Sequence, residues 1–260
     1  MTAADLQLSL QAPARLALDE PLIALARLAA ATGPVTTSSR LNLIEGDLSV
    51  VVTGPGDRRP VRAVWPYPVD SGLRRVTLAA GEMLEGGVLL LAGSGREPLF
   101  PIAGAYQLVA EFTPTPDTVV TAQPVTVVRE DPGDAAGRAR ARAFADPGVI
   151  GSLMSASVNP SAADALAGPV AASPAGRLLY ALAAGDPAEI RDAASALASA
   201  AGPVAPATTA VSVLPPGLFP GDERLAAVTA GVAGVAGVAG VDDDGRAAAL
   251  LAERSWRPAR

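Results

Sequence analysis

Carboxylates are the side chains in this sequence whose spacing comes nearest to catalytic chemistry. Asp70, Ser71 and Gly72 form a D-[ST]-G triplet, and an acid in such a triplet does hydrolytic work when two carboxylates share one proton. The triplet occurs once, so a carboxylate pair would need two copies of the chain. A β-turn accounts for the same three residues, since Asp, Ser and Gly are turn formers. We favour the turn and keep a carboxylate-based hydrolase as a disfavoured alternative.

A second acidic group, Asp242–Asp244 followed by Gly245, has the composition of one end of a calcium-binding loop. The spacing fails. If Gly245 is the sixth position, the first and twelfth positions are Gly240 and Leu251, where carboxylates are required. These acids are better suited to cap and stabilise the N-terminus of a final helix. The sequence therefore predicts no metal site and no cofactor.

Three residue types that most enzyme mechanisms need are absent. All twenty basic residues are arginine, and the chain has no lysine, histidine or cysteine. This composition excludes lysine-containing phosphate loops, Schiff-base chemistry and the Ser-His-Asp triad. It also removes the usual ligands of zinc, haem and iron–sulfur clusters. We therefore expect that the protein is not an enzyme. Its net charge of −6 gives no indication of a nucleic-acid partner.

Short apolar runs with a period of two dominate the first 128 residues and predict strands. In the run 104–113, Tyr106, Leu108, Ala110 and Phe112 are expected to face a core. The remaining predicted strands, one of them a hairpin turning at 54–57, lie at 5–11, 20–30, 48–64, 86–93 and 121–130. Short strands separated by Pro, Gly and Asp turns indicate an antiparallel β-sandwich.

Three short motifs in this half share a pattern, in which a turn residue or the first residue of a strand precedes a buried run. They are Glu20-Pro21, Gly81-Glu82 and Gly104-x-Tyr106. The pattern resembles bacterial immunoglobulin-like sandwiches, including those of the intracellular proteinase inhibitor family and macroglobulin-type domains, over residues 5–128. The resemblance implies an immunoglobulin-like fold and a tyrosine-corner-like hydrogen bond at Tyr106. It also makes a proteinase inhibitor an alternative function.

Alanine-rich helical segments follow Glu130. The clearest is a predicted helical hairpin at 173–201, which resembles a tetratricopeptide-like hairpin without a second copy. Its signals are a possible cap at Ser173, Pro174 as the first helical residue, Gly185 as a stop, and an Asp186-Pro187 restart with Glu189. Arg138, Arg140 and Arg142 are expected on a solvated helix face. We predict two separately folding parts, a sandwich at 1–130 and a helical region at 131–260.

One triplet repeats four times in Ala230–Val241, with glycine at every third residue. We interpret the repeat as a helix whose thin surface lets neighbouring helices approach closely, the alternative being a loosely packed low-complexity tract. The uncharged run 225–241 is shorter than the roughly 20 strongly apolar residues of a bilayer span, so no membrane span is expected. The N-terminal residues lack the pattern of a secretory signal, which favours a cytoplasmic location.

Aromatic and arginine residues gather in one segment that could bind a partner. The candidate residues are Trp65, Tyr67, Arg62, Arg74 and Arg75. Rigid aromatics beside arginine are typical of binding hot spots, although Trp65 could instead be buried in the core. Taken together, the sequence predicts an α+β protein that acts as a non-catalytic protein-binding or scaffold module. Its partner would be another protein, and the oligomeric state is left open.

Overall fold

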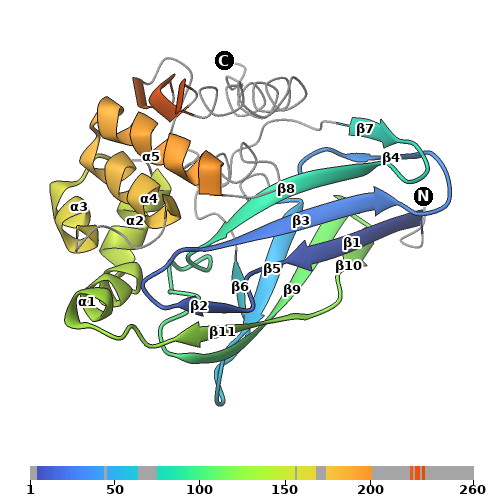
Figure 1. Cartoon of the computed structure of the whole chain (residues 1–260). Coiled ribbons are helices and arrows are strands. Elements are labelled where there is room, and N and C mark those ends of the chain that lie inside the picture. Colours follow the sequence, from blue (N-terminus) through green and yellow to red (C-terminus); the bar gives the residue numbers. More distant parts are fainter. Residues whose placement is uncertain are drawn as a thin grey trace. The chain divides into compact units, whose positions relative to one another are not determined.

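The computed structural model describes residues 5–43, 46–63, 75–155, 157–167, 174–200, 223–224, 226–228 and 230–231. The chain is α+β, with strands followed by helices (Figure 1). It divides into two compact units. Unit 1 comprises Met1–Ala17 and Leu22–Asp131, and unit 2 comprises Leu18–Pro21 and Pro132–Arg260. Separate folding of the two parts stays a prediction.

Unit 1 is built from strands. In chain order they are β1 (Leu6–Gln11), β2 (Arg15–Ala17), β3 (Leu22–Ala30), β4 (Val35–Ser38), β5 (Leu48–Thr53), β6 (Val61–Ala63), β7 (Arg75–Leu78), β8 (Met83–Leu90), β9 (Gly104–Thr115), β10 (Thr118–Thr121) and β11 (Val125–Glu130). One sheet has the order β1-β3-β8, and a larger sheet has the order β2-β11-β9-β5-β6 with β10 also paired to β9. Strands β4 and β7 form a two-stranded ribbon. All pairs are antiparallel except β2 with β11.

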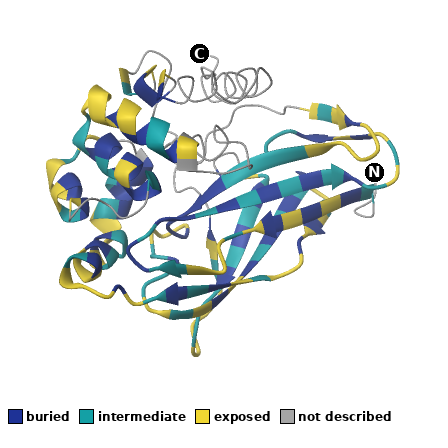
Figure 2. Ribbon diagram, viewed as in Figure 1, coloured by how far each residue is buried: buried dark blue, intermediate teal, exposed yellow. Residues whose placement is uncertain are grey.

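Alternating burial explains why these sequences form strands. Buried and more exposed residues alternate along β1 and β3, as Figure 2 shows. The prediction for β9 is confirmed, because Tyr106, Leu108, Ala110 and Phe112 are all at most 1% exposed. One hydrophobic cluster contains inward-facing residues from both larger sheets. Both sheets therefore contribute side chains to one apolar core.

Of two further strand predictions, one is confirmed and one is wrong. The hairpin at 48–64 is confirmed as β5 and β6, which pair from Val50 opposite Ala63 to Val52 opposite Val61. The run 121–130 is not one strand, because its first residue ends β10 and β11 begins at Val125. Pro124 lies at the break and has no N–H to donate to a ladder. Strands β4 and β7 were not predicted.

The tyrosine corner expected at Tyr106 is present. Its hydroxyl donates a hydrogen bond to the Ile102 carbonyl at 2.7 Å, and its ring packs edge-on against Phe100 with centroids 5.0 Å apart. Gly104, with φ +146°, lies so close to Pro55 that a Cβ atom there would be 2.8 Å from Cγ of the proline. Glycine is therefore required at this entry into β9.

Unit 2 contains helices α1 (Ala135–Phe144), α2 (Pro147–Ser155), α3 (Pro160–Leu166), α4 (Pro174–Ala184) and α5 (Pro187–Ala200), and the described residues of 223–231 are helical. The predicted hairpin signals at Pro174, Gly185 and Asp186 are confirmed. Helix α4 begins at Pro174, and Gly185 follows its last residue with φ +82°. Asp186 accepts the Ala188 N–H at 2.8 Å and caps α5. Ser173 lies outside the described residues. No described helix is long and apolar enough to cross a bilayer.

The expectation that three arginines share a solvated face of α1 was wrong for Arg140. Arg138 and Arg142 are exposed, but the Arg140 side chain is only 6% exposed and pairs with Asp19 at 2.6 Å. Successive helical residues are about 100° apart. Residues four apart therefore share a face, and the residue between them points to the opposite side.

Close approach occurs at Gly231, the first glycine of the triplet repeat. A Cβ atom there would lie 2.3 Å from the Arg191 carbonyl oxygen and 3.0 Å from Ala194 Cβ, both in α5. This glycine thus lets a helical segment lie directly on the backbone of α5. Gly234, Gly237 and Gly240 lie outside the described residues.

Candidate functional site

The structure describes two of the five residues predicted to bind a partner. Arg62, in β6, is half-exposed and forms an ion pair with Glu111 at 2.6 Å. Arg75, the first residue of β7, is exposed and belongs to a different sheet. Trp65, Tyr67 and Arg74 lie outside the described residues. A shared site for these five residues stays a prediction.

The two acidic motifs, Asp70-Ser71-Gly72 and Asp242–Asp244, also lie outside the described residues. Within the part of the chain that the structure describes, no three acidic side chains are grouped so that they could hold a metal ion. The geometry available for a functional site is instead that of a sheet edge.

Strand β1 is at the edge of the three-stranded sheet. It pairs with β3 from Leu6 opposite Ala30 to Gln11 opposite Leu25, and none of the described strands pairs with its other side. An antiparallel ladder alternates residues that exchange hydrogen bonds with residues that do not. The phase of this alternation determines which backbone groups of β1 are left over.

The hydrogen bond next to the first pair settles that phase. The Ala31 N–H donates to the Asp5 carbonyl at 2.9 Å, so Asp5 and then Gln7 and Ser9 direct their backbone groups at β3. The N–H and C=O groups of the alternate residues point away from β3. We call this outward row, formed by the backbone of Leu6, Leu8 and Leu10, the β1 edge.

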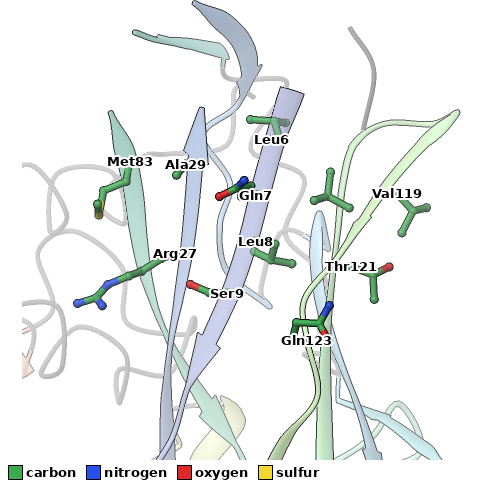
Figure 3. A pocket seen from close by; sticks show the side chains of 11 residues that line it. Leu6, Gln7, Leu8, Ser9, Arg27, Ala29, Met83, Val119, Thr121 and Gln123 are labelled. Carbon is green, nitrogen blue, oxygen red and sulfur yellow. The ribbon is translucent and has the colours of Figure 1, made fainter. Parts of the chain in front are cut away.

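A pocket of about 520 Å³ lies along the β1 edge, and we call it the edge pocket. Its lining comes from β1, from β3 and β8 of the same sheet, and from β10 with the residues that follow it: Leu6, Gln7, Leu8, Ser9, Arg27, Ala29, Met83, Val119, Val120, Thr121 and Gln123. Figure 3 shows the Leu8 side chain directed from β1 toward the strand that carries Val119 and Thr121. The edge pocket therefore opens between an unpaired strand edge and a neighbouring strand.

The chemistry of the edge pocket is neutral. Arg27 is the one charged residue of its lining; its Nε donates to Glu85 at 2.7 Å and its Nη1 to Gln11 at 3.1 Å. The other polar lining residues carry amide or hydroxyl groups. Met83 and Val119 are 51% and 52% exposed, and they are two of the four exposed large apolar residues identified in the described chain. The pocket thus combines apolar surface with backbone groups that pair with none of the strands that the structure describes.

Other sheet edges carry features that discourage pairing with a foreign strand, whereas β1 carries none. Native edges are blunted by short length, charge, proline or a bulge. Strand β10 has four residues and a register shift, and β2 and β6 have three residues each, with an arginine. Strand β8 contains Glu85. Strand β1 is six residues long, LQLSLQ, with no charge, proline or bulge.

Sequence reasoning did not locate this site. The alternation in 5–11 identified which side chains face the core, but it does not tell how many neighbours a strand has. The available signal was the neutral, proline-free composition of the run. No protein-family model matches the chain, and a search of curated proteins finds no relative.

Proposed function

We propose that this chain is a non-catalytic protein-binding module that takes up an extended partner segment as an added strand at the β1 edge. The observation that carries the proposal is the row of Leu6, Leu8 and Leu10 backbone groups beside the edge pocket, with which no described strand pairs. Strand addition uses main-chain hydrogen bonds for affinity and pockets for alternate side chains for specificity. Both features are available at this edge.

The proposal includes an immunoglobulin-like sandwich for unit 1. In that fold, strands A, B and E share one sheet and strands C, F and G share the other. The orders β1-β3-β8 and β11-β9-β5 support this assignment, as does the Tyr106 hydroxyl on the Ile102 carbonyl at the start of β9. The immunoglobulin-like fold would present its edge strands on a rigid scaffold. The cytoplasmic location stays a prediction.

A displayed library of random twelve-residue peptides, selected on the full chain, tests strand addition. Two variants at one position separate the backbone from the side chain. Leu8→Pro removes an outward N–H, and proline is tolerated in an edge strand when its missing N–H faces away from the ladder. Leu8→Ala keeps the N–H and also shrinks the side chain.

We expect enriched peptides to bind Leu8→Pro at least about tenfold more weakly than Leu8→Ala, because both variants lose the leucine side chain but the proline alone loses the edge N–H. Circular dichroism checks that both variants keep the strand content of the wild type. The proposal is wrong if no peptide is enriched, or if peptides bind Leu8→Pro as well as they bind Leu8→Ala.

A further inference from the structure

We infer that the strand taken up at the β1 edge is β1 of a second copy of this chain, in an antiparallel register centred on Leu8. This inference rests on the proposed function and names the partner of the same site. The resulting dimer has one continuous sheet in the order β8-β3-β1-β1-β3-β8 across a two-fold axis. Such an interface is isologous, so each residue type must be compatible with its two-fold mate.

The outward backbone groups decide the register. The backbone N–H and C=O groups of Leu6, Leu8 and Leu10 point away from β3. These three residues must therefore form the hydrogen-bonded pairs of the new ladder. With a two-fold axis at Leu8, Leu8 pairs with Leu8 of the second copy and Leu6 pairs with Leu10. Each pair exchanges two hydrogen bonds, which satisfies the whole outward row.

Side chains match in this register on both faces of the sheet. The inward face places leucine beside leucine at every pair, and the Leu6, Leu8 and Leu10 side chains already belong to the hydrophobic cluster. On the outward face, Gln7 lies directly opposite Ser9 of the second copy, and an amide and a hydroxyl can hydrogen-bond. Val119, which is 52% exposed beside the edge, is available for contact with the added strand.

The lack of charge along β1 favours a second copy of the chain as the strand added at the β1 edge. The chain carries a net charge of −6, so two copies repel one another wherever acidic surfaces meet. Strand β1 is uncharged throughout, and the charged lining residue Arg27 is already paired with Glu85. The seam between two β1 strands is therefore neutral, and like charges do not face each other along it.

Sedimentation velocity over a wide range of concentrations tests the inference, with three double variants of the full chain. Gln7→Glu with Ser9→Glu places like charges directly opposite each other at both outward pairs. Gln7→Lys with Ser9→Glu places opposite charges there. Ala105→Glu with Gln107→Glu is the matched control, because it puts the same charges at the same spacing on β9, an interior strand of the larger sheet.

We expect a discrete dimer for the wild type and the control, and a dissociation constant raised at least about tenfold by the two glutamates, because like charges opposite each other destabilise strand pairs. The Lys/Glu variant should restore dimerisation to the wild-type level or better. A monomeric wild type, a ladder of larger aggregates, or no rescue by the Lys/Glu variant would each overturn the inference.

The two proposals fail separately. If wild-type protein stays monomeric while selected peptides bind it and are lost on Leu8→Pro, strand addition stands and the second copy is wrong. If the protein neither dimerises nor binds peptides, both are wrong.

Discussion

Alanine makes up a larger share of the buried residues in unit 2 than in unit 1. Unit 1 fills its core with large side chains, among them Tyr106 and Phe112, on strands whose faces alternate. Unit 2 buries alanine repeatedly along α4 and α5, beside large residues such as Leu178 and Ile190, and Gly231 approaches α5 next to Ala194. Large side chains keep two sheets well apart, whereas small ones let helix backbones come close.

Glycine has two uses in the chain. Gly81 and Gly104 of unit 1 have positive φ values, and so does Gly185 of unit 2. In unit 2, the helical residues Gly137 and Gly231 lie where another segment approaches, and a Cβ at Gly137 would lie 3.1 Å from Asp19 Oδ2. Inside the helices of unit 2, glycine therefore supplies space for a neighbouring segment rather than a special backbone conformation. The same space admits the carboxylate that Arg140 binds.

Arg140→Ala is expected to have the largest effect, because it leaves the Asp19 carboxylate buried without its partner. Removing one member of a buried ion pair typically costs about 3–5 kcal/mol in the free energy of unfolding. Urea denaturation followed by helical circular dichroism measures it. Arg142→Ala is the control, since Arg142 is exposed on the same helix and such changes usually stay within about 0.5 kcal/mol.

A further variant separates the ion pair from packing. Replacing both charges with apolar residues, as in Asp19→Leu with Arg140→Met, should recover much of the loss, because it leaves no unpaired buried charge. If Arg140→Ala were as mild as Arg142→Ala, the ion pair would not hold unit 2 together.

Gly231→Ala tests whether close approach matters in unit 2. Alanine favours a helix by about 1 kcal/mol over glycine, but its Cβ would lie 2.3 Å from a backbone oxygen of α5. Overpacking of this kind typically costs about 1–3 kcal/mol, so we expect a lower melting temperature. Gly133→Ala is the control, since no heavy atom outside its chain neighbours lies within 4 Å of a Cβ there. A higher melting temperature for Gly231→Ala would favour the loose-tract interpretation.

Local sequence patterns predicted an element correctly where its position depends on neighbouring residues alone. The alternation in β9 identified its buried face, and Pro174 and Gly185 marked the two ends of α4, because these signals act through neighbouring residues. Arg140 could not be placed from its neighbours. Its partner, Asp19, is more than a hundred residues away in the chain, and nothing local indicates that a charge is buried.

The candidate site could not be predicted for a related reason. Whether β1 is an edge depends on which strands pair, and pairing is a property of the whole sheet. Gln7 and Ser9 look like ordinary solvent-facing residues in LQLSLQ. They gain a role only once β3 is on one side and no described strand is on the other.

Tyr106→Phe should have the smallest effect, because it removes one hydrogen bond and leaves the large-side-chain core of unit 1 intact. Ile102 is 49% exposed, so water can replace the hydroxyl at its carbonyl, and a loss of about 1 kcal/mol in the free energy of unfolding is expected.

Tyr106→Phe should also change how the stability of unit 1 depends on pH. Burial raises the pKa of the Tyr106 phenol, with the hydrogen bond to Ile102 acting in the opposite direction. Its folded-state pKa therefore exceeds the unfolded value of about 10, so the stabilisation is full below about pH 10 and falls as pH rises through the folded pKa. Because the chain has no lysine, few other groups titrate there. Thermal melts from neutral to alkaline pH should show that Tyr106→Phe loses less stability than the wild type above about pH 10. Equal losses in the two proteins would mean that the buried phenol does not govern the alkaline stability of unit 1.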